Sequence, residues 1–233
     1  MTDALILASA TVLNSASKGS GMRAEEALKR LKEGNARFVA GESEHPRLGA
    51  AHRARIAENG QHPFVTIMGC SDSRASIELL FDQGVGDVFV IRVAGNVIGA
   101  HEAGSIEYGI GPLQTPLLVV LGHTHCSAVA AAARGAAMDG NIPELLAPIA
   151  SVVADVRGEH PEAEGAHLLD LAIQANVFNS IQSLLLRSEC ARRLVKEKKL
   201  RIEGAVYDLS TGEVSFLGEH PRQAALLEPP SNI

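Results

Sequence analysis

The sequence predicts an α/β fold, with a mostly parallel central sheet, flanking helices, an N-terminal helical arm and a C-terminal edge hairpin. Three short apolar runs rich in β-branched residues predict buried strands at Phe64–Met68, Asp87–Val93 and Leu117–Leu121. Helical stretches lie between these runs, and strands that alternate with helices are typical of a parallel sheet with crossover helices. A length of 233 residues, 46% of them hydrophobic, suits one globular domain.

The chain before the first strand has a helical pattern. Apolar residues recur on one face of Met22–Val39 and charged residues on the other, until Gly41 and Pro46 break the pattern. We expect a second, short helix at Ala50–Glu58 and a turn at Gly60–Pro63. An amphipathic helix ahead of the sheet is suited to lie across a second subunit.

Further helices and one hairpin complete the expected elements. Helices are expected at Ser76–Phe81, His101–Ile110, 127–138, Ile142–Val156, Glu162–Glu189 and Ala191–Lys199. The apolar runs Ile202–Leu209 and Glu213–Leu217 flank a Ser-Thr-Gly turn, which predicts a hairpin at a sheet edge.

The N-terminus and the rest of the chain have different characters. We expect residues 1–21 to form a flexible or trimmed arm and residues 22–233 a single domain. The apolar run Ala4–Leu13 resembles part of a leader, but no Lys or Arg precedes it, so a leader is neither predicted nor excluded. No run approaches the ~18–20 apolar residues of a membrane helix. The expectation is a cytoplasmic or other soluble compartment, without membrane insertion.

The charge balance argues against nucleic acid as a partner. The chain has 21 Lys and Arg against 27 Asp and Glu, which gives a net charge of −6. Binding to the phosphates of nucleic acid needs positively charged surface, and base stacking needs more aromatic residues than the 3% present.

Two of the three cysteines occupy positions suited to a metal. Cys70 follows the first predicted strand, and Cys126 follows the third, three residues after His123. The carboxyl ends of parallel strands are where ligands bind, and two thiolates with one imidazole suit tetrahedral zinc. Three protein ligands leave the fourth position open, as in catalytic zinc sites. On these residues alone, a redox or structural site is also compatible, and Cys190 has no assigned role.

The loop after the first strand adds a charged pair. Asp72 and Arg74 follow Cys70 closely, and an Arg can hold a carboxylate ionised and oriented. Cys70–Arg74 and Gly122–Cys126 match the C-x-D-S-R and G-H-x-x-C motifs of the β-class carbonic anhydrases, and the chain resembles that family over roughly residues 24–217. The stretches 81–84, 89–96 and 104–108 also resemble the family's core.

The resemblance implies a zinc enzyme. Cys70, His123 and Cys126 would hold one Zn²⁺ per chain, and Asp72 and Arg74 would form the catalytic pair. The implied reaction is the reversible hydration of carbon dioxide to bicarbonate and a proton by zinc-bound hydroxide. The family also has a closed state, in which the residue matching Asp72 is the fourth zinc ligand.

The resemblance also implies a substrate pocket and an oligomer. Gln61 matches a glutamine that one branch of the family uses to hold substrate across a subunit interface, so a homodimer or a dimer-based tetramer is expected. Phe89 and Tyr108 match apolar walls of the pocket, although simple core packing also explains them. Ser127 stands where the family usually has Gly, and its side chain disfavours a positive φ, which bears on substrate geometry.

Two alternatives stay open at this point. Relatives on the same fold hydrolyse carbonyl sulfide or carbon disulfide, and the motifs do not separate these substrates from carbon dioxide. A non-catalytic relative that binds zinc or bicarbonate is the other alternative, which the departure at Ser127 would favour.

Overall fold

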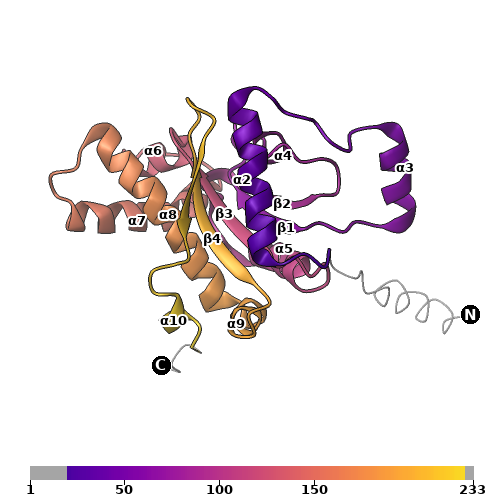
Figure 1. Ribbon diagram of the computed structural model, residues 1–233. Coiled ribbons are helices and arrows are strands. Elements are labelled where there is room, and N and C mark those ends of the chain that lie inside the picture. The colour runs from indigo at the N-terminus through magenta and orange to yellow at the C-terminus, as the bar shows by residue number, and fades with distance from the viewer. Residues whose placement is uncertain (1–19, 229–233) are drawn as a thin grey trace, which may run out of the picture.

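The computed structural model describes residues 20–228 (Figure 1). The arm expected at residues 1–21 lies outside this range except for Ser20 and Gly21, which are exposed and not helical. Within the described range, no helix combines the length and the apolar character needed to cross a membrane.

Five strands form one sheet in the order β2-β1-β3-β4-β5. Strands β1 (Val65–Gly69), β2 (Val88–Arg92), β3 (Leu117–His123) and β4 (Arg201–Tyr207) are parallel, and β5 (Val214–Gly218) pairs antiparallel with β4 at one edge. The chain passes from β1 to β2 on one side and then to β3 on the other side of β1. A crevice outside the strand ends at such a reversal is a general place for ligands.

The strands confirm the predicted α/β class, the mostly parallel sheet and the edge hairpin. One difference concerns β3, which continues beyond the predicted end at Leu121 to His123. Its pairing with β4 extends to His123 opposite Tyr207, so a partner strand keeps the polar end of β3 in the sheet.

Helices cover both faces of the sheet (Figure 1). In chain order they are α2 (Ala24–Ala40), α3 (Ala50–Asn59), α4 (Ile77–Leu80), the 3₁₀ turn η1 (Ala94–Asn96), α5 (Ala100–Ile110), α6 (Ser127–Ala133), α7 (Ile142–Glu159), α8 (Gly165–Arg187), α9 (Glu189–Lys196) and α10 (Gln223–Leu226). The short helix α10 is not among the predicted elements. The expected helix 127–138 is too long, because Gly135 at φ 58° takes a left-handed conformation just after α6 ends.

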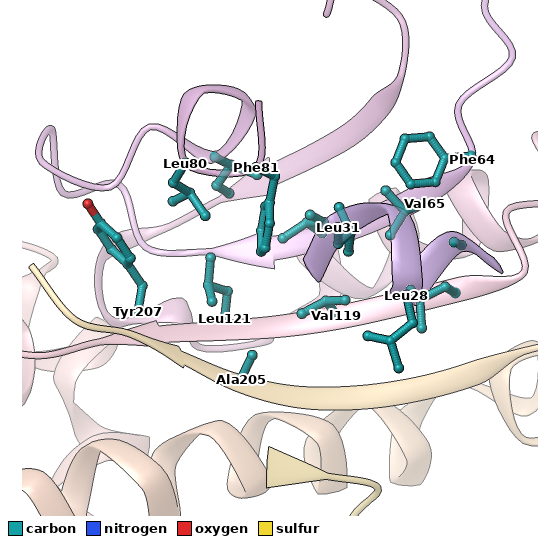
Figure 2. Close-up of a cluster of buried hydrophobic side chains, with 14 of the residues drawn as sticks. Leu28, Leu31, Phe64, Val65, Leu80, Phe81, Val119, Leu121, Ala205 and Tyr207 are labelled. Carbon is teal, nitrogen blue, oxygen red and sulfur yellow. The ribbon is translucent and has the colours of Figure 1, made fainter. Parts of the chain in front are cut away.

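Helix α2 packs its apolar face on the sheet. Leu28 and Leu31 belong to the same buried cluster as Val119 and Leu121 of β3, and Figure 2 shows these side chains directed toward one another. Full burial of each leucine contributes about 1.5–3 kcal/mol. The helix stops at Gly41, whose φ of 71° allows a left-handed cap.

The opposite face of the sheet packs against α5, α8 and α9. Val177, Ile181 and Leu184 of α8 are fully buried in a cluster with Leu118 and Val120 of β3. Because both faces are covered, β1 and β3 are buried along their whole length, as their continuous apolar sequences predict. A third apolar cluster, built largely from α6, α7 and α8, lies beyond the strand ends and includes Cys70 and Cys126.

One segment departs from this compact arrangement. Residues 41–63 carry α3 to the side of the sheet (Figure 1), and α3 has no buried residue. This segment is called the arm from here on, and it is distinct from the N-terminal arm expected at residues 1–21. The base of the arm is held by the fully buried carboxylate of Asp82, which accepts hydrogen bonds from Arg37 at 2.6 Å and from the backbone N–H of Glu44 and His45. The arm is therefore anchored by polar contacts rather than by an apolar core.

Candidate metal centre

The structure brings Cys70, His123 and Cys126 together. Cys70 follows β1, His123 ends β3, and Cys126 comes directly before α6. One ligand atom from each lies within 4.8 Å of the others, and all three residues are buried. The strand reversal between β1 and β3 therefore forms the ligand cluster within a single chain, as the sequence predicts.

The orientation of His123 suits a metal ligand. Its Nδ1 lies 2.8 Å from the Thr124 carbonyl oxygen, so Nδ1 carries the proton and donates it, leaving the Nε2 lone pair free. Within the described part of the chain, Nε2 is buried and has no hydrogen-bond partner. A buried nitrogen without a partner is unfavourable by about 1–3 kcal/mol, unless an ion takes its lone pair.

The two sulfurs also suit a metal ion. The Cys126 thiol next to Cys70 contributes most to lowering the pKa of Cys70, and with the neighbouring His123 ring and a hydrogen bond from the Gly95 backbone N–H it brings that pKa to about 4 against the effect of burial. The Gly95 nitrogen lies 3.2 Å from the Cys70 sulfur. The same sulfur–sulfur contact raises the pKa of Cys126. The pair therefore favours one thiolate even without metal, and a bound metal ion deprotonates both thiols.

This donor set fits zinc. Two sulfurs and one imidazole nitrogen are ligands that zinc accepts in tetrahedral geometry, and soft thiolates disfavour magnesium and calcium. The surroundings are apolar, because Cys70 and Cys126 pack in a cluster with Val129 and Ile149. Three protein ligands would leave one of the four tetrahedral positions of zinc for a small molecule.

Asp72 stands next to this cluster and is held by Arg74. Arg74 Nε and Nη2 donate to the two carboxylate oxygens at 2.9 and 2.7 Å, and the Arg74 backbone N–H donates at 3.0 Å. Asp72 Oδ2 lies 3.9 Å from Nε2 of His123. The guanidinium of Arg74 holds the pKa of Asp72 well below its usual range. The pair thus presents an ionised, oriented carboxylate beside the ligand atoms.

Arg92 is a site residue that the sequence reasoning missed. Its Nε donates to the Cys70 carbonyl at 2.8 Å and its Nη2 to the Asp72 carbonyl at 2.6 Å, so one guanidinium clamps the loop that carries both side chains. Arg92 is the last residue of β2 and pairs with Gly69 of β1, the residue just before Cys70, so its side chain starts close to this loop. The clamp itself depends on a contact between two strands, which no local motif encodes.

Gln61, Phe89 and Tyr108 lie on elements that carry none of the three proposed ligands. Gln61 lies exposed between α3 and β1, and Phe89 of β2 contacts Tyr108 of α5, with ring centroids 6.0 Å apart. Tyr108 is 49% exposed, whereas Phe89 is half-buried and packs against the apolar cluster on that face of the sheet. Among residues 20–228, no hydrogen bond, ion pair or ring contact joins these three to the cluster.

The structure corrects the expectation about the backbone at Ser127. The sequence raised a conflict between serine and a positive φ, but Ser127 is the first residue of α6 and lies outside the positive-φ set. The left-handed residue of this loop is His125 at φ 55°, whose carbonyl accepts a hydrogen bond from Arg74 at 3.3 Å.

Comparisons with known proteins agree on one family. The family model described as carbonic anhydrase matches residues 65–214. A protein of Mycobacterium tuberculosis named carbonic anhydrase 2 is 42% identical over 202 residues, which cover 83% of this chain and 92% of that protein. A carbonic anhydrase of Mycolicibacterium smegmatis is 39% identical over 198 residues, covering 83% of this chain and 94% of the relative.

Solved structures share the fold. A β-carbonic anhydrase of Aspergillus fumigatus is similar with a TM-score of 0.69 and 27% identity, covering 86% of this chain and 95% of the other. A structure described as one of two tetrameric β-carbonic anhydrases from Sordaria macrospora has a TM-score of 0.65 and 26% identity, covering 82% and 96%.

Proposed function

Because the chain belongs to the β-class carbonic anhydrases, we propose that Cys70, His123 and Cys126 hold its zinc ion and that Asp72 and Arg74 act on the substrate beside it. The enzyme is a zinc lyase that catalyses the reversible hydration of carbon dioxide to bicarbonate and a proton. The relatives reported above are named carbonic anhydrases, so the carbonyl sulfide, carbon disulfide and non-catalytic alternatives are not favoured.

The ligand roles rest most directly on the orphaned nitrogen of His123. Its buried Nε2 has no partner among the described residues, while Nδ1 is fixed by the Thr124 carbonyl. When bound, zinc lowers the pKa of a coordinated water towards neutrality. The Cys70 and Cys126 side chains supply the other two donors from within an apolar cluster.

Asp72 orients the nucleophile in this proposal. An ionised carboxylate accepts a hydrogen bond but does not retain a proton at neutral pH, so it fixes the direction of the attacking oxygen's O–H. The bidentate contact with Arg74 keeps Asp72 ionised and turned, and Arg92 fixes the backbone beneath it. These contacts support an open state, because Arg74 donates a hydrogen bond to each of the two carboxylate oxygens.

The substitution Asp72→Asn tests this role. It keeps the size of the side chain but removes the charge, so carbon dioxide hydration should fall by about 10²-fold, the range for losing one preorganised electrostatic contact. Zinc content should stay at that of the wild type. Stopped-flow hydration and zinc determination on the same sample measure both quantities, and full activity in the variant would remove Asp72 from the mechanism.

We also propose that the working unit is a homodimer, alone or paired into a tetramer, in which Gln61 serves the site of the neighbouring subunit. Gln61 is exposed on the arm, and α3 on the same arm has no buried residue within its own chain. The ring pair of half-buried Phe89 and exposed Tyr108 lies at the edge strand β2, where a second subunit can complete an apolar wall. The tetrameric relative from Sordaria macrospora supports an oligomer.

Mixed dimers test the shared site. If Gln61 of one subunit completes the site of the other, a dimer of one Asp72→Asn chain and one Gln61→Ala chain contains one complete site. Mixing the two impaired variants under exchange conditions should therefore restore activity above that of either variant alone. Mixed dimers with no gain in carbon dioxide hydration would show that Gln61 does not act across the interface.

The remaining assignments concern the whole chain. We propose that residues 22–233 form one domain, since the apolar clusters on both faces share strands of one sheet. We also propose a cytoplasmic or other soluble compartment, which the three cysteines support because none of them forms a disulfide.

A further inference from the structure

The sulfur of Cys70 is contacted by a turn with unusual backbone geometry. Gly95 has φ 73° and the next residue, Asn96, has φ 44°. The Gly95 N–H donates to the Cys70 sulfur at 3.2 Å. Left-handed conformations are rare outside glycine and persist only where the surroundings hold them, so this N–H depends on support from neighbouring elements.

Helix α8 supplies that support with two side chains. Asn176 Nδ2 donates to the Gly95 carbonyl at 2.8 Å, and Ser180 Oγ donates to the Asn96 carbonyl at 2.9 Å. Residues four apart lie on one face of a helix, one turn above the other. Both side chains are 1% exposed, so the hydrogen bonds are shielded from competing water.

The polar character of this patch stands out against its neighbours. Ala172, Val177 and Ile181 surround it on α8 and are fully buried. The Oδ1 atom of Asn176 is itself buried and has no hydrogen-bond partner in the described part of the chain, which is unfavourable by about 1–3 kcal/mol. An apolar residue at position 176 would avoid the cost of burying an unpartnered oxygen. What Asn176 provides that an apolar residue cannot is the hydrogen bond to the turn.

Packing leaves the turn little freedom once it is seated. A Cβ added to Gly95 would lie 2.5 Å from Ile149 Cδ1 of α7 and 3.1 Å from Ala128 Cβ of α6. Apolar contacts thus fix where the turn sits, and the hydrogen bonds from α8 fix the rotation of the Gly95–Asn96 and Asn96–Val97 peptide groups, whose carbonyls accept them. The Gly95 N–H belongs to the preceding Ala94–Gly95 peptide group, so these bonds hold its direction through the φ angle of Gly95, which joins the two groups.

We propose that Asn176 and Ser180 are positioning residues that strengthen zinc binding by aiming the Gly95 N–H at the Cys70 sulfur. The inference rests on the proposed role of Cys70 as a zinc ligand. Hydrogen-bond partners behind metal ligands orient them and tune the metal, and removing such a partner typically weakens metal binding 10–100-fold.

Substitutions on α8 separate this role from general packing. Asn176→Leu keeps a similar volume but removes the hydrogen bond, and Ser180→Ala removes the hydroxyl. Leu184→Ala is the matched control, because Leu184 is fully buried on the same helix but belongs to the apolar cluster on the sheet face. That control should lower stability by about 2–5 kcal/mol without touching the turn.

Zinc affinity is the primary measurement. Metal-free protein competes with a chelator for zinc at one fixed pH, with carbon dioxide hydration recorded separately. Asn176→Leu should weaken zinc binding about 10-fold, Ser180→Ala should weaken it less, and Leu184→Ala should bind zinc as the wild type does. Ser180→Thr, which keeps the hydroxyl, should retain the affinity of the wild type.

Cobalt substitution gives a readout that a merely structural role would not change. The thiolate-to-cobalt charge-transfer absorption reports on the metal–sulfur bonds, so it should change in Asn176→Leu and stay unchanged in Leu184→Ala. If Asn176→Leu does not fold, Ser180→Ala decides the question by the same two measurements.

The outcomes distinguish this inference from the ligand assignment on which it rests. Folded Asn176→Leu and Ser180→Ala proteins with the zinc affinity and cobalt spectrum of the wild type would overturn the positioning role, and so would an equal loss in Leu184→Ala. Cys70→Ser should lose far more affinity than either variant. Zinc binding by Cys70→Ser at the wild-type level would instead refute Cys70 as a ligand.

Discussion

The cluster of proposed zinc ligands and the arm are held in place by different kinds of contact. Cys70, His123 and Cys126 lie where two buried parallel strands end, and an apolar cluster packs around the sulfurs. The arm at residues 41–63 carries a helix without buried residues and is tied to the body through the carboxylate of Asp82. The three proposed zinc ligands therefore come from one chain, whereas the arm has exposed side chains that can contact a second one.

The difference shows how the two regions respond to perturbation. Ligands fixed at strand ends move only if the sheet moves, so the cluster depends on its metal and on few neighbouring groups. The arm depends on charge and hydrogen bonding, which pH changes directly. Removing the metal should act on the first region, and neutralising Asp82 on the second.

Zinc removal should have the largest effect. A chelator that strips the metal should reduce carbon dioxide hydration by about 10³-fold or more, because Lewis acidity supplies several kcal/mol at about 1.4 kcal/mol per tenfold in rate. Added zinc should restore the rate, and the same chelator saturated with zinc beforehand is the control. Hydration that persists in metal-free protein would contradict the assignment of the cluster.

Asp82→Asn should be the next largest change, and it acts on the arm. Asp82 is fully buried and accepts three hydrogen bonds, one of them from a guanidinium. Loss of its charge should lower the free energy of unfolding by about 2 kcal/mol, measured by urea titration, with zinc content unchanged. Glu44→Gln is the control, since that side chain is 67% exposed and 4.0 Å from Arg37.

The same variant tests a pH dependence. Burial alone would raise the pKa of Asp82, but hydrogen bonds from Arg37 and from the backbone N–H of Glu44 and His45 outweigh it, so the pKa lies below the ordinary 3.8. The contribution of Asp82 is then fully present above pH 3.8 and is lost as the pH falls through the lower folded-state pKa. The stability gap between wild type and Asp82→Asn should shrink below pH 3.8, and a gap that widens in acid would contradict this sign.

Ser127→Gly should have the smallest effect, although it lies next to a ligand. Because Ser127 is helical and exposed at the start of α6, glycine has no strained backbone to relieve there. The hydration rate should stay within about 2-fold of the wild type, as for exposed substitutions worth less than 0.5 kcal/mol. A clear rise in rate would instead show that the serine side chain obstructs the substrate.

The sequence predicted the parts of the site that local patterns encode. The strands before Cys70 and the ligand pair of His123 and Cys126 follow from apolar runs and close spacing, and the sheet order then places them together. The pairing of Asp72 with Arg74 was also predictable, because only Ser73 lies between them in the chain.

The parts that escaped prediction depend on contacts distant in sequence. Arg92 clamps carbonyls 20 and 22 residues away, and Asn176 supports a turn 81 residues away. No spacing rule signals such pairs, since either residue alone is compatible with many environments. The extension of β3 to His123 likewise depends on its pairing with β4, and the early end of α6 depends on the backbone conformation at Gly135.

The most direct test of the account is the zinc content of three single cysteine variants. Cys70→Ser and Cys126→Ser each remove a thiolate from the cluster, whereas Cys190→Ser changes the partly exposed third cysteine and serves as the control. After dialysis against a weak chelator, the first two should lose zinc and carbon dioxide hydration together, and the third should retain one zinc per chain and full activity. Zinc retained at the wild-type level in Cys70→Ser or Cys126→Ser, or lost in Cys190→Ser, would contradict the central claim.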